Sequence, residues 1–448
     1  MKIIASVLAA SLICSAAAIV PQTSGFSVSA NADVCTAAVH GSLTYNEYSD
    51  HAEVLQCNTS AAGAIDIPSK IDNLPVTTIK SYAFNECTGI TSVTIADSVT
   101  TMERCAFYSC TGLKSIKLSA NLKSISNSVF WNCVKLTSIT IPNGVTSLGD
   151  SVFWGCAAIN SVELPKSLIS IGICTFSDCT SLNKIVIPQN VKAIGEGAFQ
   201  NCTSLTSMTI PDGMKTISDY TFHGCSKLKS LTIPSSITSF GKYAVYGCFW
   251  LTSLKLPDNI TSIGEYTFYD CFNLSSFTIP SKVTSIGESA FYGCSSLSSI
   301  SIPNGVAKIN DNTFFNCNKL KQIIIPKSVT SISQSAFLKS GLTALTGYEG
   351  SYAQKFASAN SLGFNAIPNE IGDIDNDHAI NAIDASMVLT AYASISSGKA
   401  SGLSSVQQKA ADANSDGIIN SVDASCILSY YSYLSNNGKM SFSDFMKK

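Results

Sequence analysis

The sequence predicts an α/β repeat solenoid of parallel strands and short helical turns, followed by a small all-α domain built on two calcium-binding loops. Three observations predict it. Cysteine, proline and apolar residues recur with one constant period, the step from Cys87 to Cys110, through most of the chain. The repeat stops near Pro368. Two aspartate-rich segments then follow, one beginning at Asp373 and one at Asp412, with the ligand spacing of calcium loops.

The composition excludes nucleic acid as a partner. The chain has 448 residues, of which 45% are hydrophobic and 13% are charged, about half the usual charged fraction. With 28 Lys and Arg against 30 Asp and Glu, the formal net charge is −2, and phosphate binding needs a basic face. The surface must therefore rely on neutral polar side chains.

The start of the chain, over 1–32, predicts a secretory signal peptide. Met1-Lys2 precedes an apolar and small-residue run over 3–20, and Ala30-Asn31-Ala32 forms a cleavage site. Cleavage after Ala32 would remove Cys14. A transmembrane anchor is the alternative, but the many Ala and Ser residues of the run and the cleavage site favour export. No second long apolar run follows, so we expect a secreted protein without a transmembrane segment, extracellular or associated with a cell-surface complex.

Cysteine marks the repeat, because eleven of the 17 cysteines are equally spaced along the chain: Cys87, Cys110, Cys133, Cys156, Cys179, Cys202, Cys225, Cys248, Cys271, Cys294 and Cys317. Leu or Ile follows each by three and by eight positions, and Phe precedes all but one by three. A unit this short buries its apolar side only by stacking on its neighbours, which predicts a solenoid.

Within a unit, the alternation over 136–141 predicts a strand that Pro142 ends. Parallel strands would stack about 4.8 Å apart. The Phe-x-x-Cys segment is expected to form a short helical turn on the opposite wall. We expect an N-terminal cap over 33–62, the solenoid over 63–345, and a C-terminal cap with a helix over 346–367.

These units resemble the BspA-like leucine-rich repeats of bacterial surface and secreted proteins, which have this length and this I-P…I-G…F-x-x-C pattern. The resemblance covers about residues 40 to 367. The first unit, Ile65 through Val76, carries a short insertion, and the last has Ser340 in place of the cysteine. The resemblance implies a leucine-rich-repeat fold.

Two explanations of the cysteine column compete. Strand spacing would permit disulfides, but an odd number cannot pair fully, and the column lies on the inward side with Phe and Leu. We therefore predict reduced thiols that act as small apolar fillers. The absence of a C-x-x-C pair argues against metal binding. Cys105 and Cys174 are predicted core substitutions, whereas Cys35 and Cys57 lie in the N-terminal cap and are either free or joined in a disulfide.

An acidic column admits a catalytic and a structural explanation. Neighbouring carboxylates about 5 Å apart would suit a retaining glycosidase, whereas carboxylates at the first turn of a helical segment satisfy backbone amides. The sequence shows no Ser-His-Asp pattern, nucleophile elbow or phosphate loop, so the structural role is favoured. The column comprises Asp150, Glu196, Asp219, Glu265, Glu288 and Asp311.

An aromatic column lies two positions before the ladder cysteines. Such rings either form a face for a glycan or protein or stack on one another to shield the wall, and the second role is favoured. The candidate ligand face is Tyr108, Trp131, Trp154, Tyr246, Tyr269 and Tyr292, with His223 and Phe315 in the same column. Exposed Ser and Thr on the strands would supply uncharged hydrogen bonds.

The last part of the chain contains two candidate calcium loops. Calcium takes six to eight oxygen ligands, and this spacing wraps them around one ion. Each loop leads into an apolar segment, which favours calcium over plain acidic helix caps, so two Ca²⁺ ions are expected. The predicted ligands are Asp373, Asp375, Asp377, the Ala379 carbonyl, Asn381 and Asp384 in loop one, and Asp412, Asn414, Asp416, the Ile418 carbonyl, Asn420 and Asp423 in loop two.

This paired arrangement resembles a dockerin, the calcium module that binds a cohesin on a scaffoldin. The resemblance covers about residues 371 to 438, within an expected domain over 368–438 and a tail over 439–448. His378 stands where loop two has Gly417, so loop one must turn without glycine. The resemblance implies cohesin contacts at Ala382-Ile383 and Ser421-Val422, and their difference argues against two equivalent binding faces.

We therefore predict a secreted, non-catalytic leucine-rich-repeat protein that a calcium-dependent dockerin attaches to a cellulosome-type complex. The repeat domain would bind a glycan or a protein at the surface. Two alternatives stay open: a component of polysaccharide degradation with hydrolase activity, and a purely structural spacer.

Overall fold

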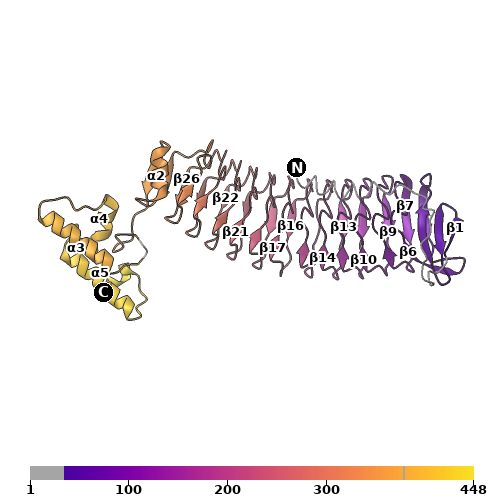
Figure 1. Cartoon of the computed structure of the whole chain (residues 1–448), viewed down its shortest axis with the longest axis horizontal. Coiled ribbons are helices and arrows are strands. Elements are labelled where there is room, and N and C mark those ends of the chain that lie inside the picture. The colour runs from indigo at the N-terminus through magenta and orange to yellow at the C-terminus, as the bar shows by residue number, and fades with distance from the viewer. Residues whose placement is uncertain (1–34, 377–378, 448) are drawn as a thin grey trace, which may run out of the picture.

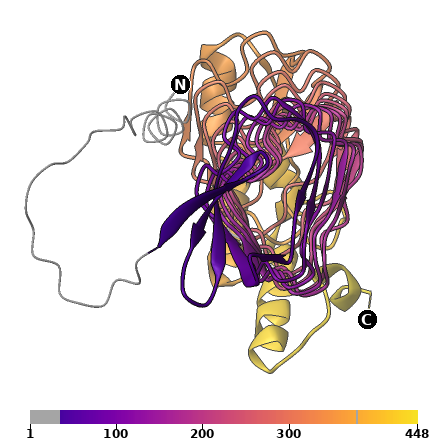
Figure 2. The ribbon, with the colours of Figure 1, turned by 90° about the vertical axis from the view of Figure 1, so that its right-hand side faces the viewer.

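The computed structural model describes residues 35–376 and 379–447. A long stack of coils carries a small helical domain beyond its C-terminal end (Figure 1), and the view along the stack shows the coils superimposed (Figure 2). The predicted signal peptide lies outside the described residues. No helix within the described part of the chain combines the length and apolar character that a bilayer-spanning helix requires.

The N-terminal cap is a three-stranded antiparallel meander. It comprises β1 (Thr36–His40), β2 (Leu43–Glu47) and β3 (Ala52–Cys57). β3 pairs in parallel with β6 (Leu74–Ile79), which begins the stack. The short insertion of the first unit forms a hairpin between β5 (Lys70–Ile71) and β6. Its turn residues, Asp72 and Asn73, have φ values of 45° and 68°, which Asn and Asp tolerate.

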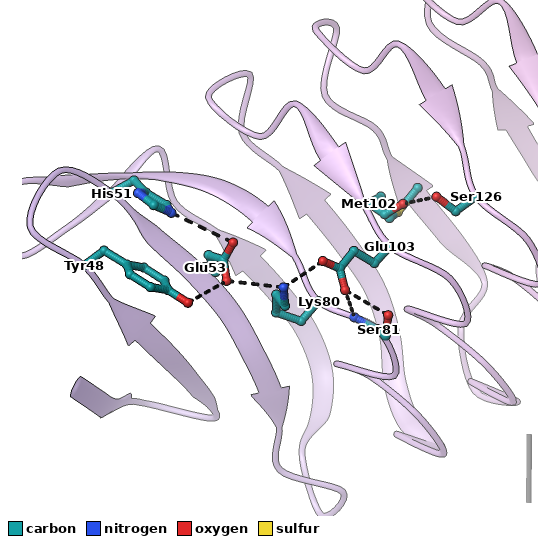
Figure 3. Close-up of polar contacts among 8 residues, drawn as sticks. All are labelled: Tyr48, His51, Glu53, Lys80, Ser81, Met102, Glu103 and Ser126. Carbon is teal, nitrogen blue, oxygen red and sulfur yellow. Dashed lines mark hydrogen bonds and ion pairs between the residues drawn. The ribbon is translucent and has the colours of Figure 1, made fainter. Parts of the chain in front are cut away.

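Polar contacts join this cap to the first coils (Figure 3). The Lys80 ammonium lies 3.5 Å from the Glu53 carboxylate and 2.7 Å from the Glu103 carboxylate. The Tyr48 hydroxyl donates to Glu53 at 3.3 Å, and Glu103 also accepts from the Ser81 amide at 2.9 Å. These contacts stabilise the stacking of the cap on the repeats.

The predicted strand recurs in the coils, except in the coil around Ile185, and lines one wall. Paired strands of this wall are parallel and match equivalent residues of adjacent coils, as Ser138 does with Ser161. Its inward residues are buried and its outward residues exposed. The strands of this wall are β4 (Ala62–Ile67), β7 (Gly89–Ile95), β9 (Ser115–Lys117), β11 (Ser138–Thr140), β13 (Ser161–Glu163), β16 (Ser207–Thr209), β18 (Ser230–Thr232), β20 (Ser253–Leu254), β22 (Ser276–Phe277), β24 (Ser299–Ser301), β26 (Gln322–Ile325), β28 (Ala344–Gly347) and β29 (Gly363–Ala366).

A second, shorter ladder of parallel strands was not predicted. Its strands end on a buried apolar residue at the Ile position of the I-G pair, such as Leu148 or Ile171. The ladder comprises β8 (Thr101–Met102), β10 (Ser124–Ile125), β12 (Ser147–Leu148), β14 (Ser170–Ile171), β15 (Ala193–Ile194), β17 (Thr216–Ile217), β19 (Ser239–Phe240), β21 (Ser262–Ile263), β23 (Ser285–Ile286), β25 (Lys308–Ile309) and β27 (Ser331–Ile332). Two ladders of parallel strands define a parallel β-solenoid.

The wall around Phe-x-x-Cys consists of turns instead of the expected helical turns. The Phe130 amide donates to the Val152 carbonyl of the next coil at 2.9 Å, and the Cys133 amide donates to the Phe130 carbonyl at 3.2 Å. Ser128 and Asn132 have φ values of 57° and 58°, which a right-handed helix does not contain. Amides that an α-helix would satisfy internally therefore bond between coils.

Phe rings and Cys thiols fill the core. Successive ring centroids from Phe84 to Phe222 lie 4.5 to 5.8 Å apart. Each ladder thiol from Cys110 onward donates to the carbonyl of the Phe, or of its replacement Val245, one coil earlier, as from Cys156 to Phe130 at 3.0 Å. Cysteine thus combines small size with a weak donor.

The C-terminal end of the stack is closed by β29 and by α2 (Tyr352–Ala359), a helix within the segment expected to form the C-terminal cap. The domain beyond contains α3 (Ala382–Ser396), α4 (Ser405–Ala411), α5 (Ser421–Ser435) and α6 (Phe442–Phe445). The expected tail over 439–448 is not separate from this domain. It contains α6, whose Phe442 is buried in the domain core against Tyr430, with ring centroids 5.0 Å apart.

Candidate functional site

Loop one brings three predicted ligands together. Asp373, Asp375 and Asp384 each offer an oxygen, and these oxygens lie within 4.8 Å of one another. Asp373 and Asp384 are 1% and 0% exposed. Asp377 and His378 lie outside the described residues. Buried carboxylates that converge are stable only when paired with positive charge, so the residues present fit a calcium ion.

Backbone amides hold the loop-one ligand Asp384. It is the third residue of α3 and accepts hydrogen bonds from the amides of Ile374 at 2.7 Å and Asn381 at 2.9 Å. Burial raises the pKa of its carboxyl, while these amides lower it. The Asn381 side chain accepts from the Ile383 amide at 2.7 Å, so it caps α3, and its own amide group donates to the Ala379 carbonyl at 2.9 Å.

Loop two repeats this framework. The Asp423 carboxylate accepts from the amides of Asn414 at 3.2 Å and Asn420 at 2.9 Å. Asp412 accepts from Gly417 at 2.9 Å, and Asp416 accepts from Ile418 at 2.8 Å. Gly417 has a φ of 84°, the left-handed conformation that favours glycine. Among the described residues, the carboxylates of Asp412, Asp416 and Asp423 are not gathered as closely as the three of loop one.

Lys327 of the solenoid reaches loop one. Its ammonium donates to the carbonyls of Asp375, at 2.9 Å, and Asn376, and it lies 5.8 Å from the ring centroid of Tyr348. Lys327 therefore contacts loop one through backbone carbonyls and not through its carboxylates.

Helices α3 and α5 begin at the two loops and expose matching sets of apolar residues. The predicted contacts Ala382, Ile383, Ser421 and Val422 lie in their first turns and are exposed. The other exposed apolar residues were not predicted. Aligning the two helices on Asp384 and Asp423 would have revealed them, because apolar residues then fall at the same positions of both helices. The exposed apolar residues are Ile383, Leu389, Tyr392 and Ile395 on α3, and Val422, Leu428, Tyr431 and Leu434 on α5. Equivalent positions of the two helices thus hold identical or similar apolar residues.

The acidic column of the solenoid has structural partners. Asp150 accepts from the Ile173 amide and Asp219 from the Lys242 amide, each at 2.8 Å and one coil further along. Glu265 forms an ion pair with Lys242 at 2.9 Å, and Glu288 accepts from the Tyr266 hydroxyl at 3.1 Å. These four carboxylates therefore bond to groups of neighbouring coils.

Comparisons with known proteins identify both parts of the chain. A family model for BspA type leucine-rich repeat regions (6 copies) matches residues 63–167, 148–274 and 238–362. The chain belongs to this family. A model of the dockerin type I domain matches residues 371–430. Dockerins bind calcium and pair with cohesins, so the two matches support a protein-interaction role of cellulosome type in an extracellular or cell-surface protein.

Solved structures share the repeat fold. A leucine-rich repeat protein from Bacteroides ovatus is 25% identical and has a TM-score of 0.61, with 72% of this chain and 82% of that chain covered. The pneumococcal vaccine antigen PcpA is 18% identical and has a TM-score of 0.51, with 75% and 100% covered, and shows the fold alone. A search of curated proteins finds no match.

Of the two alternatives for Cys35 and Cys57 in this BspA-type protein, the structure has the unbridged one. Cys35 and Cys57 are both free thiols, the first exposed and the second buried. Cys57 pairs with Leu43 at one end of β2, whereas Cys35 precedes the pairing of Thr36 with Glu47 at the other, so the length of β2 separates them. None of the 16 described cysteines forms a disulfide, and the ladder thiols, like those of Cys105 and Cys174, are buried.

The aromatic column of the BspA-type repeats stacks on itself. Tyr246, Tyr269 and Tyr292 follow one another with centroids 4.7 and 4.2 Å apart and planes within 10° of parallel. Trp131 and Trp154 lie 4.5 Å apart, and Tyr108 lies 5.8 Å from Trp131. Neighbouring rings therefore cover much of the ring faces, and these residues are only partly exposed.

A second aromatic group is more exposed. Phe249, Trp250 and Phe272 follow two ladder cysteines directly and are 38%, 49% and 38% exposed. The two Phe rings stack 5.0 Å apart, and the Lys229 ammonium lies 4.9 Å above the Trp250 ring. Corresponding positions in the other ladder-cysteine units hold small, polar or aliphatic residues, so unit-by-unit comparison would have found this group.

Proposed function

We propose that this is an exported, non-catalytic protein that its dockerin attaches to a cohesin, with one Ca²⁺ ion in each of the two loops. The observation that carries the proposal is the duplicated loop-and-helix unit. Each loop holds its last ligand, Asp384 or Asp423, on backbone amides at the start of a helix with an exposed apolar face. Calcium would supply the positive charge that lets these carboxylates converge and fix both helices.

The cohesin face extends along the helices beyond the four first-turn residues. Large apolar side chains exposed on a small domain mark an interaction surface, and here they recur at matching positions of α3 and α5. This recurrence supports a face on each helix, despite the difference between Ala382-Ile383 and Ser421-Val422. A protein partner would bury Leu389 and Tyr392, or Leu428 and Tyr431.

The repeat domain is proposed to bind a glycan or a protein, without catalysis. Support comes from Asp150 and Asp219 of the acidic column, which accept amides of the next coil, and from exposed Ser and Thr along the strand wall. The six-residue ligand face remains a proposal. Because its rings stack on one another, a ligand would contact their edges and hydroxyls. A spacer role would leave the solenoid without a ligand.

The test uses the intact chain on immobilised cohesin. Leu389→Asp and Leu428→Asp are expected to weaken binding singly if one face dominates, and only together if the faces are equivalent. Full binding by the double variant would refute the proposed face. Intact protein held on cohesin is then offered polysaccharides and secreted proteins. Retention of a ligand supports the binding role, and release of sugar fragments would contradict the non-catalytic role.

A further inference from the structure

Three polar side chains meet in the N-terminal cap, far along the chain from the calcium loops. His40 ends β1, Glu47 ends β2 and Asp72 lies in the β5–β6 turn. The His40 Nε2 atom lies 3.1 Å from a Glu47 oxygen and 3.4 Å from an Asp72 oxygen. All three ligand atoms lie within 4.8 Å of one another.

We propose that these three side chains form a binding site for a divalent transition-metal ion of the zinc class. Zinc binds imidazole nitrogen at about 2.0–2.1 Å and carboxylate oxygen at about 2.0–2.2 Å, in tetrahedral geometry. Those bond lengths place neighbouring ligand atoms about 3.3–3.5 Å apart, close to the two measured separations. Asp72 is exposed at a turn, so its carboxylate can rotate to complete the third edge.

The donor set favours this metal class over calcium. Calcium takes six to eight oxygens, whereas one imidazole with two carboxylates suits zinc and its neighbours. Three protein ligands leave a fourth position, and the partial exposure of His40 and Glu47 gives water access to it.

The position of the site gives it a structural role. β1 is the edge strand of the cap, and Cys35 and Cys57 form no disulfide there. A metal ion held by His40, Glu47 and Asp72 would tie the β1–β2 hairpin to the β5–β6 turn. It would supply the cross-link that small caps in exported proteins otherwise obtain from disulfides.

The test uses the full chain with excess Ca²⁺ and a Cys35→Ser background, which removes an exposed thiol ligand. After incubation with Zn²⁺ and gel filtration, bound zinc is measured by mass spectrometry. His40→Ala and Asp72→Asn are expected to lose one equivalent and to weaken zinc binding by at least about tenfold. His51→Ala is the matched control, because His51 lies in the same cap beside Asp50 and Glu53, and it should retain the metal.

Equal amounts of bound zinc in His40→Ala and His51→Ala would overturn the proposal. The contacts of His40 with Glu47 and Asp72 would then be ordinary ion pairs. Hydrogen exchange provides an independent measurement. Zn²⁺ should slow exchange of the β1 and β2 amides in the background protein and in His51→Ala, but not in Asp72→Asn. Exchange that zinc leaves unchanged in the background protein would also overturn it.

Discussion

Truncation of one ring in the Phe column tests how the solenoid is held together. Phe176 is fully buried, and its centroid lies 5.4 Å from those of Phe153 and Phe199. A buried Phe→Ala change costs about 3–5 kcal/mol, and each aromatic contact contributes about 0.5–1.5 kcal/mol beyond burial. Because both neighbours lose a partner, we expect Phe176→Ala to lower the free energy of unfolding by the upper part of that range.

The chain itself contains a compensated version of this change. Val245 occupies the Phe position of one coil, and there Phe240 of β19 approaches the next ring, Phe268, at 6.1 Å. Phe176→Val with Ile171→Phe reproduces that natural pair. When urea unfolding is monitored by hydrogen exchange, the double variant should have a free energy of unfolding about 1 kcal/mol or more above that of Phe176→Val alone. If Phe176→Ala lowers the free energy of unfolding by less than about 1 kcal/mol, the stacking argument is refuted.

Three further outcomes are expected. Burial raises the pKa of the Cys225 thiol from 9.0 to about 12, so the folded chain keeps this proton longer than the unfolded chain. The contribution of this thiol to the free energy of unfolding should be fully present below pH 9. It should fall by about 1.4 kcal/mol per pH unit as the pH rises toward about 12. Alkaline unfolding without this slope would contradict the assignment of reduced packing cysteines. Calorimetric titration should find two Ca²⁺ ions, one fewer in Asp384→Asn, and no change in Asp444→Asn, whose carboxylate is exposed on α6; a single ion in the unaltered chain would disprove the two-loop assignment. If the repeat domain binds its ligand through open ring faces, Trp250→Ala should weaken binding by several-fold more than Trp154→Ala, and the reverse order in the same binding assay would favour the predicted aromatic column.

The constant period made the solenoid predictable, because each apolar column has one inward position in every coil. The turn wall was less predictable. Its amides bond between coils. Residues that favour positive φ, such as Asn132 and Gly155, are a weak sequence signal for this, because Tyr220 and Cys174 adopt positive φ in the same wall. A local pattern of apolar residues cannot distinguish such turns from one helical turn.

The convergence of Asp373, Asp375 and Asp384 was predictable from spacing, since these residues come from one short segment. Contacts between distant segments were not. The meeting of His40 with Asp72 depends on how the cap folds, and the absence of a Cys35–Cys57 disulfide follows from the strand register. The burial of Phe442 also needed tertiary structure, because a helix as short as α6 has no clear period.

The calcium dependence of cohesin binding tests the central claim most directly. The dissociation constant of the intact chain for a dockerin-binding cohesin is measured in Ca²⁺ and again in excess chelator. We predict tight binding in Ca²⁺, loss of binding in chelator, and recovery when Ca²⁺ is restored, because the ion orders the two loops that start α3 and α5. Equal affinity in both conditions would contradict the account.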